Sequence, residues 1–412
     1  LHRGTVLTEL EAVKVMEANA PECMPAHLND IVENVDPSVP DSVVDQLSQL
    51  LRKYSKAFSK DEYDLGWTDK VKHKIDTGNH PPARQALRRV PLAQREVIDR
   101  HIDEQLRQGI IRPAQSPFAS NLVIVKKHDG STRCCVDFRL VNQISTHDSY
   151  TLPRLDQCID ALGGDNAWFS CLDMRSSYHQ VAMDEKDAEK TAFICHRGSF
   201  LYNTMPMGLR NSGATFQRLM DMVMAGLTFE VCLVYLDDIV VFSKTLEEHL
   251  QRLEMVLQRL VDTGLKLKPS KCRMLQRRIV FLGHVVTEDG VSTDPAKTEQ
   301  ISKWPRPNSF REVRGFLGLC GYYRKFIDRY AEIAAPLTSM LKKGHRFGWS
   351  DEAETAFEKL KSVLTSPPIL AMPKDDGLFI LDTDASDISI GAVLSQIQDG
   401  QERVIAYAAK VL

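Results

Sequence analysis

Two adjacent aspartates interrupt an otherwise apolar segment in the middle of the chain. Residues 231–242 read VCLVYLDDIVVF, so Asp237 and Asp238 lie between two runs that are typical of buried β-strands. A plain hairpin turn explains the break, because aspartate is common in turns. Two-residue hairpins nevertheless favour Asn-Gly or Asp-Gly, and two adjacent carboxylates beside buried strands repel each other. Bound Mg²⁺ would remove that repulsion, so the doublet predicts either a turn or a metal site.

A third carboxylate ends another strand-like run and favours the metal site. Asp173 follows residues 168–172, which read WFSCL. If this strand lies beside the hairpin, Asp173, Asp237 and Asp238 converge at one edge of a sheet. Carboxylates in such a position can hold two metal ions about 3.5–4 Å apart, an arrangement that serves phosphoryl transfer. The three aspartates are therefore the candidate catalytic and metal-binding residues.

The composition is that of an ordinary globular protein. The 412 residues are 43% hydrophobic and 26% charged, and no apolar run approaches the ~20 residues that cross a bilayer. This length allows two to four domains. The nine cysteines are odd in number and include no C-x-x-C pair, which predicts free thiols in a reducing compartment. The chain does not begin with Met, so we expect it to be cut from a longer protein.

The net charge of −3 does not by itself indicate a nucleic-acid-binding protein, but the basic residues are unevenly distributed. One cluster falls in residues 84–112 and another in residues 266–278. Both clusters suit a groove that follows a phosphate backbone, but charge alone favours the alternative of two solvated faces. Their members are Arg84, Arg88, Arg89, Arg95, Arg100, Arg107 and Arg112, then Lys266, Lys268, Lys271, Arg273, Arg277 and Arg278.

Hydrophobic periodicity divides the chain into four regions. We expect a linker-like region over residues 1–80 with one amphipathic helix at 41–58, and a mixed α/β region over 81–290. A helical region over 291–348 and a new α/β segment over 349–412 follow. The other predicted elements are helices at 92–108, 213–223, 245–261 and 352–364, hairpins at 122–138 and 231–242, and strands at 167–173, 378–381 and 390–396.

Three segments, in this order, resemble the polymerase motifs of reverse transcriptases. They are residues 172–180 (LDMRSSYHQ), 205–209 (MPMGL) and 235–238 (YLDD). The similarity is greatest to gypsy-type long-terminal-repeat retrotransposons and extends from about Val71 to the end of the chain. It implies an α+β fold: a right-hand polymerase with fingers, palm and thumb, followed by an incomplete ribonuclease H-like α/β segment. Fingers and palm would correspond to the second region and the thumb to the third.

The resemblance also implies roles for residues around the doublet. Asp173 and Asp237 resemble the family's metal ligands, and Asp238 resembles the supporting acid of the same site. Tyr178 occupies the position of an aromatic gate against the ribonucleotide 2′-hydroxyl, with a core tyrosine as the alternative. The other implied substrate-binding residues are Lys126, Lys127 and Arg133, which would clamp the triphosphate, and Met207 and Gly208, which would lie against the incoming base.

Two later segments resemble further parts of the family. Phe281, Leu282, Gly283 and His284 resemble the hairpin that holds the primer terminus. The last region resembles the first hairpin of a ribonuclease H domain, with Asp384 as its first metal ligand. That chemistry needs more carboxylates on later elements. The only ones that follow, Asp387, Asp399 and Glu402, have no matching position, so we predict that this chain has no ribonuclease H activity.

These observations predict an RNA-directed DNA polymerase that uses two Mg²⁺ ions, with Mn²⁺ as a substitute, to add dNTPs to a primer on an RNA or DNA template. A decayed nucleic-acid-binding remnant is the alternative, and the intact carboxylates weigh against it. An RNA-dependent RNA polymerase is disfavoured by Tyr178, because such an enzyme must admit the 2′-hydroxyl. Asp76-Thr77-Gly78 matches an aspartic-protease tripeptide without the surrounding apolar strands that a protease needs. The oligomeric state and the compartment, cytoplasmic or nuclear, stay open.

Overall fold

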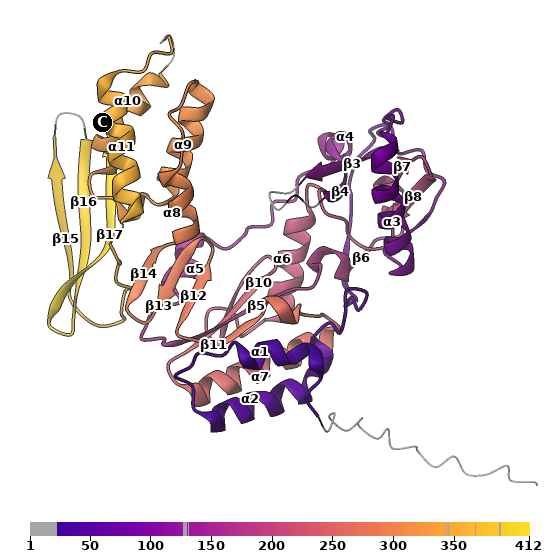
Figure 1. The fold of residues 1–412 in the computed structure, drawn as a ribbon, viewed down its shortest axis with the longest axis horizontal. Helices are drawn as coiled ribbons and strands as arrows, with labels where there is room; N and C mark the ends of the chain where they lie inside the picture. The colour runs from indigo at the N-terminus through magenta and orange to yellow at the C-terminus, as the bar shows by residue number, and fades with distance from the viewer. Residues whose placement is uncertain are drawn as a thin grey trace, which may run out of the picture.

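The computed structural model describes residues 23–126, 130, 132–342, 344, 346–366, 368–386 and 389–412. Two lobes extend from a central sheet region, one containing helix α9 (Phe310–Tyr322) and the other containing helix α3 (Leu92–Arg107). The C-terminal strands lie on the outer side of the α9 lobe (Figure 1). This arrangement confirms the expected α+β fold with a hand-like order of fingers, palm and thumb.

The central sheet contains the two strands that flank the aspartate doublet and the strand that ends in Asp173. One face packs on helices α6 (Ser212–Val223) and α7 (Leu246–Thr263), and the other packs on the thumb lobe. All of its strand pairs are antiparallel. In spatial order the strands are β11 (Arg273–Gln276), β5 (Trp168–Asp173), β10 (Asp238–Ser243) and β9 (Cys232–Tyr235).

Side chains of β10 alternate between the two faces of the sheet, as the period of a strand requires. Ile239 and Val241 belong to the core that contains α6 and α7, whereas Val240 and Phe242 belong to the core shared with the thumb. Asp238 has the same parity as Val240 and Phe242. Its carboxylate therefore lies on the thumb side of the sheet.

Helix α7 corresponds to the helix predicted at 245–261 and continues to Thr263. The Thr245 side chain accepts a hydrogen bond from the backbone N–H of Glu248, which satisfies a free donor of the first turn. Gly264 takes a left-handed φ of 71° and ends the helix. In the same way, the Ser309 side chain caps α9 by accepting from the N–H of Glu312.

The N-terminal region differs from the expected linker. In its described part, helices α1 (Asn29–Glu33) and α2 (Asp41–Lys53) belong to the same core as the palm, and Leu47 of α2 is fully buried. The apolar stripe that predicted an amphipathic helix needs a partner surface, and α7 provides it. The linker interpretation was therefore wrong for these residues, and the boundary expected at residue 80 does not separate two cores.

The fingers lobe is built on a five-stranded sheet. The predicted hairpin of residues 122–138 is present as β3 (Ser120–Lys126) and β4 (Thr132–Val136), and most of its loop lies outside the described residues. Helix α4 (Arg139–Ile144) follows β4. The spatial order is β2 (Ile111–Pro113), β8 (Gly198–Tyr202), β7 (Phe193–Cys195), β3 and β4, and β1 (Thr68–His73) pairs separately with β6 (Val181–Met183).

The thumb and the C-terminal strands share one hydrophobic core. The ring centroids of Phe316 on α9 and Phe357 on α11 (Asp351–Thr365) are 4.6 Å apart. The expected boundary at residue 349 therefore falls within a core. The remaining elements are α5 (Leu155–Asp160), β12 (Arg278–Phe281), β13 (His284–Thr287), β14 (Gly290–Thr293), α8 (Pro295–Ser302), α10 (Tyr330–Met340), β15 (Phe379–Ala385), β16 (Ser389–Gln398) and β17 (Gln401–Val411).

All nine cysteines are free thiols, as their spacing predicts. The buried ones are Cys158, Cys195, Cys232, Cys272 and Cys320. In the part of the chain that the structure describes, no helix combines the length and the apolar character needed to cross a membrane.

A buried histidine links strands β5 and β10 to the helix beneath them. His249 of α7 has its Nε2 atom 2.7 Å from Ser170 Oγ on β5 and its Nδ1 atom 2.8 Å from Ser243 Oγ on β10. Ser243 donates onward to the Thr245 carbonyl, and Ser170 accepts from the N–H of Leu275. Burial lowers the pKa of His249 to about 3, so the ring is neutral at pH 7.

Replacing His249 with leucine is expected to lower the free energy of unfolding by about 2–4 kcal/mol at pH 7, because two buried hydroxyls lose a partner. The pH dependence should change as well. The unfolded chain protonates this histidine below pH 6.5, whereas the folded chain resists protonation down to about pH 3. Its contribution to stability is thus complete above pH 6.5 and falls as the pH drops through that window.

In the wild type, the free energy of unfolding should fall by about 1.4 kcal/mol per pH unit within this window because of His249. The leucine variant should lack this contribution. Urea denaturation of both proteins at pH 7 and pH 5 measures the two effects. An identical pH dependence in the two proteins would contradict a neutral, buried His249.

Candidate active site

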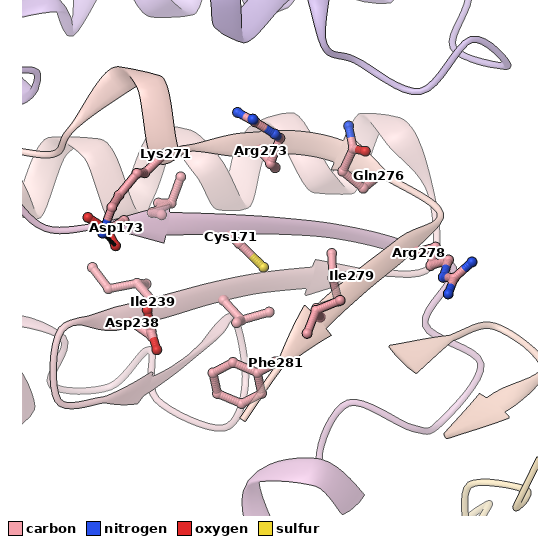
Figure 2. A pocket seen from close by; sticks show the side chains of 13 residues that line it. Cys171, Asp173, Asp238, Ile239, Lys271, Arg273, Gln276, Arg278, Ile279 and Phe281 are labelled. Carbon is pink, nitrogen blue, oxygen red and sulfur yellow. Dashed lines mark hydrogen bonds and ion pairs between the residues drawn. The ribbon is translucent and has the colours of Figure 1, made fainter. Parts of the chain in front are cut away.

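The antiparallel register of β5 and β10 places two carboxylates opposite each other. Asp173 and Asp238 are direct cross-strand partners, and Cys171 and Val240 form the corresponding pair two residues further along the strands. Directly opposed residues have Cβ atoms about 4.5–5.5 Å apart. Figure 2 shows both aspartates at the same end of the sheet. The structure thus brings together two of the three predicted aspartates.

The third aspartate lies in the turn between β9 and β10. Tyr235 pairs with Asp238, so the two turn residues are Leu236 and Asp237. Leu236 has a left-handed φ of 54°, a conformation that usually requires glycine. The sequence interpretation placed the doublet itself in the turn. It was wrong by one residue, because Asp238 already pairs with Asp173 as the first residue of β10.

A buried glutamine holds this turn. The Oε1 atom of Gln217 on α6 accepts a 2.8 Å hydrogen bond from the N–H of Leu236, and its Nε2 donates to Asp221 and to the Val234 carbonyl. A non-glycine residue in a strained backbone conformation costs on the order of 1–3 kcal/mol, and this bond offsets part of that cost. The sequence did not reveal Gln217, because a helical pattern does not show which distant amide a side chain reaches.

Asp237 is in contact with the segment that follows Asp173. Ser177 Oγ donates to Asp237 Oδ2 at 3.4 Å, and the N–H of Met174 donates to the Asp237 carbonyl at the same distance. Both hydrogen bonds are long. The β9–β10 turn therefore contacts the end of β5 only through weak hydrogen bonds. All three aspartates lie at the same end of the sheet.

Negative charge at this end of the sheet is only partly neutralised. Burial raises the pKa of Asp238, the charges of Asp237 and Asp173 raise it further, and Lys271 lowers it. Asp238 as a whole residue is exposed, so water reaches part of it. Lys271 Nζ lies 2.9 Å from Asp173 Oδ2, so one lysine already balances one side of the cluster. The sequence had placed Lys271 only in a basic cluster.

The donor set suits a hard divalent cation, although the side chains do not enclose one. Mg²⁺ prefers carboxylate oxygens, and the raised pKa of Asp238 shows a local deficit of positive charge. Within the described ranges, no three His, Cys, Asp or Glu side chains converge closely enough to hold a metal ion. The residues fit such an ion by their chemistry, and Lys271 occupies one carboxylate oxygen of Asp173.

Tyr178 lies between the doublet and helix α6. Its ring packs edge-on against Phe216, with centroids 5.7 Å apart. Burial and then the charge of Asp237 raise the pKa of its hydroxyl. A Cβ atom on Gly213 would lie 4.0 Å from that hydroxyl, so glycine leaves space there. Tyr178 is half-buried, with its ring against the core and its hydroxyl near the candidate site.

Two predicted nucleotide-binding residues from distant segments are in contact. The Arg133 guanidinium on β4 donates to Met207 Sδ. Gly208 has a φ of 93°, and its carbonyl accepts a 2.8 Å hydrogen bond from Asn142 Nδ2. The fingers hairpin therefore reaches the segment that resembles the base-binding loop. The other two predicted residues of this group are Lys126, exposed at the end of β3, and Lys127, which lies outside the described residues.

The predicted primer hairpin is the turn between β12 and β13. Phe281 pairs with His284, and the turn residues Leu282 and Gly283 have φ values of 47° and 71°. Positive φ at both positions is the pattern of a type I′ turn. Phe281 belongs to the core on the thumb side of the central sheet, which is the side of the two paired carboxylates.

A cavity of about 340 Å³ opens beside the paired carboxylates. Cys171 of the central sheet lies on one side of it, and Ile279 and Phe281 of β12 lie on the other (Figure 2). Val240 also lines the cavity. Arg278 lies at one end of it. The sequence did not predict this cavity, because it arises where β12 packs over β5 and β10.

Asp384 lies in the outer lobe, on β15 (Figure 1). Its carboxylate is 72% exposed and pairs with Arg329 at 3.6 Å. Of the later acids, Asp387 lies outside the described residues and Asp399 is 3.5 Å from Lys374. The structure does not bring Asp384 to the three aspartates of the central sheet.

Family models match the two parts of the chain that contain these aspartates. Residues 125–286 match the model described as reverse transcriptase (RNA-dependent DNA polymerase). Residues 349–412 match the model described as an RNase H-like domain found in reverse transcriptase. The first range includes all three aspartates of the candidate active site.

Similar curated proteins are longer than this chain. It is 42% identical over 359 residues to the retrovirus-related Pol polyprotein from transposon 297 of Drosophila melanogaster, a match that covers 85% of this chain and 34% of that protein. The Pol polyproteins from transposons opus and gypsy of the same species are 37% and 33% identical, over 92% and 90% of this chain and 40% and 37% of theirs. The chain thus spans a little over a third of these relatives.

Solved structures with the same fold include foamy viral enzymes. The foamy viral protease-reverse transcriptase dRH in complex with double-stranded DNA has a TM-score of 0.84 at 24% identity, covering 93% of this chain and 67% of that one. The complex of the foamy viral protease-reverse transcriptase with an RNA/DNA hybrid has a TM-score of 0.79 at 23% identity, covering 94% and 52%. At these identities the likeness shows the fold alone.

The chain therefore carries a reverse transcriptase domain, the domain of RNA-directed DNA polymerases, followed by an RNase H-like region. It is homologous to the Pol polyproteins of gypsy-family long-terminal-repeat retrotransposons over a little over a third of their length. The resemblance carried by the three sequence motifs is confirmed.

Without divalent metal, Asp238→Asn is expected to raise the melting temperature at pH 7 by about 1–3 °C. The pKa of Asp238 is higher in the folded than in the unfolded chain, so its charge opposes folding above the unfolded pKa. The neutral amide of asparagine removes this unfavourable charge. The difference in melting temperature should therefore vanish at acidic pH, where Asp238 of the wild type is protonated. Differential scanning fluorimetry in EDTA measures it, with exposed Asp69→Asn as the control. An Asp238→Asn protein that melts below wild type would contradict the repulsion.

Proposed function

We propose that this chain is an RNA-directed DNA polymerase that extends a primer with dNTPs, with Asp173, Asp237 and Asp238 as its catalytic carboxylates. The observation that carries the proposal is the register of β5 against β10, which sets Asp173 opposite Asp238 and beside the Asp237 turn. Residues 81–290 would supply the fingers and palm, and residues 291–348 the thumb.

Reverse transcriptases generally use divalent metal ions, and the three aspartates would hold two Mg²⁺ ions, with Mn²⁺ as a substitute. When bound, such ions lower the pKa of the primer hydroxyl and stabilise the charge of the leaving pyrophosphate. The protein's own contribution is to hold the three carboxylates in place. Strand pairing sets Asp173 and Asp238, and Gln217 sets Asp237 through the amide of Leu236.

Nucleotide selection is assigned to residues around the carboxylates. Tyr178 would exclude the 2′-hydroxyl of a ribonucleotide, and its support is the position of its hydroxyl near Asp237. Arg133 would grip the triphosphate, because a guanidinium can bind phosphate through two hydrogen bonds and this one already reaches Met207. Lys126 and Lys127 would bind the triphosphate with it, and Gly208 would lie against the incoming base.

The proposed partners are an RNA or DNA template with its primer. Structures of similar fold, the foamy viral enzymes, are complexes with double-stranded DNA and with an RNA/DNA hybrid. In this chain, Lys271, Arg273 and Arg278 line the cavity beside the carboxylates. They supply positive charge where a phosphate backbone would pass. Residues 281–284 would hold the primer end.

Asp237→Asn is expected to reduce primer extension by about 10³-fold or more, because one of the three proposed metal-binding carboxylates is lost. Binding of an RNA/DNA hybrid should change little. Single-nucleotide extension on an RNA template with Mg²⁺ and dNTPs measures the first effect, and fluorescence anisotropy measures the second. Asp69→Asn should keep full activity. Wild-type protein that binds the hybrid but never extends it would favour the nucleic-acid-binding remnant.

Tyr178→Val is expected to lower discrimination between dNTPs and rNTPs by about 10²-fold, whereas Tyr178→Phe, which keeps the ring, should preserve it. The ratio of kcat/KM for dCTP and CTP in the three proteins measures this. If the valine variant extends primers and discriminates like the wild type, Tyr178 is a core tyrosine without a gating role.

We also propose that this chain does not cleave the RNA of a hybrid. The proposal is supported by the surroundings of the acids, since Asp384 pairs with Arg329 and Asp399 lies beside Lys374. Two-metal hydrolysis needs several carboxylates around the ions.

Pure protein with Mg²⁺ is therefore expected to leave the RNA strand of an RNA/DNA hybrid intact during an incubation in which it extends primers. A gel of end-labelled RNA checks this. Cleavage that Asp384→Asn abolishes would overturn the proposal, because it would show that Asp384 works in a functional site.

A further inference from the structure

The β12–β13 turn is held by two tyrosines of the thumb. Tyr322 is the last residue of α9, and Tyr323 follows it directly. The Tyr322 hydroxyl donates to the Leu282 carbonyl at 2.6 Å, and the Tyr323 hydroxyl donates to the Gly283 carbonyl at 2.8 Å. Both turn residues of the hairpin are thus bonded to one end of one thumb helix, across 40 residues of chain in each case.

Each of these two carbonyls also accepts a second hydrogen bond. His284 Nδ1 donates to the Leu282 carbonyl at 2.9 Å, and the N–H of Asp294 donates to the Gly283 carbonyl at 3.2 Å. Burial lowers the pKa of His284 to about 4, so the ring is neutral and this contact fixes its tautomer. The two carbonyls of the turn therefore accept four hydrogen bonds. The amides of Leu282 and Gly283, in contrast, make no hydrogen bond to any residue that the structure describes.

The two tyrosines differ in what burial demands of them. Tyr323 is 1% exposed, so its hydroxyl cannot bond to water and needs a hydrogen-bond partner within the protein. Tyr322 is 40% exposed, and water could satisfy its hydroxyl. Its short bond to the Leu282 carbonyl is therefore not forced by burial. The rings pack edge-on against each other, with centroids 5.0 Å apart, and both lie against His284.

We propose that Tyr322 and Tyr323 are positioning residues that couple helix α9 to the β12–β13 turn, so that the thumb sets where the primer end lies relative to the carboxylates. The inference rests on the proposed polymerase function. Occupied carbonyls hold the turn in one orientation and leave its two amides as the available groups. Amides are the donors that a phosphodiester accepts, so a fixed turn offers the primer strand a fixed contact.

The test removes the hydroxyls and keeps the rings. Tyr322→Phe, Tyr323→Phe and the double variant are compared with Tyr330→Phe, a matched control in the same lobe whose hydroxyl makes a 3.4 Å bond to the Leu317 carbonyl. Single-nucleotide kinetics, the number of nucleotides added per binding event and the melting temperature are measured for each protein on one primer–template.

The expected result is a kcat that falls about five-fold for Tyr322→Phe and more than ten-fold for the double variant, since each lost hydrogen bond carries a modest net effect. The KM for dNTP should stay unchanged, because the nucleotide pocket is untouched. Fewer nucleotides should be added per binding event. Tyr330→Phe should match wild type in kinetics even if its melting temperature falls. A double variant that matches Tyr330→Phe in kcat and in product length would overturn the proposal.

Failure of the polymerase proposal is distinguishable from failure of this one. If wild-type protein extends no primer, the polymerase proposal fails, and the coupling is then tested by the affinity for a primer–template measured by fluorescence anisotropy. The double variant should bind about five-fold or more weakly than Tyr330→Phe. Equal affinities would overturn the coupling.

Discussion

The pairing of Asp173 with Asp238 across β5 and β10 is the constraint on which the rest of the candidate site depends. Both faces of β10 are apolar, so burial alone does not select one register, and a slip of one residue would turn a carboxylate to the helix side. The bonds from His249 to Ser170 and Ser243 do select it, because these two hydroxyls meet one imidazole only in this pairing. A neutral, buried polar network on one side of the sheet thus fixes the charged groups on the other.

Charge and backbone strain are concentrated where this register ends. Burial and the two neighbouring carboxylates raise the pKa of Asp238, and Lys271, which pairs with Asp173, offsets this in part. The adjacent turn has a leucine in a left-handed conformation, which the Gln217 side chain of α6 supports. Such costs persist only where surrounding packing enforces them, and they are typical of functional sites. A similar principle applies at the β12–β13 turn, where positive φ values are combined with four donors on two carbonyls.

Local patterns in the sequence predicted much of the fold. The VCLVYLDDIVVF segment predicted the hairpin, hydrophobic periodicity predicted a helix at 245–261 that corresponds to α7, and the three motifs indicated the family. The errors involve contacts that are distant in sequence. The N-terminal helices were assigned to a linker because the surface that buries them, on α7, lies some 200 residues later in the chain. The contacts of Gln217, Lys271 and the thumb tyrosines were not predicted for the same reason. Each of these side chains contacts a backbone or carboxyl group that only the fold brings near.

The divalent-metal site that we propose at Asp173, Asp237 and Asp238 depends on the register of β5 and β10. The most direct test is Mn²⁺ binding to the protein in complex with primer–template and a non-reactive dNTP analogue, followed by electron paramagnetic resonance. Wild type is expected to bind Mn²⁺ at this site, and Asp173→Asn and Asp237→Asn should each weaken binding by about ten-fold or more, while Asp69→Asn should not. Equal Mn²⁺ binding by wild type and both variants would show that the ions are held elsewhere and would overturn the proposed site.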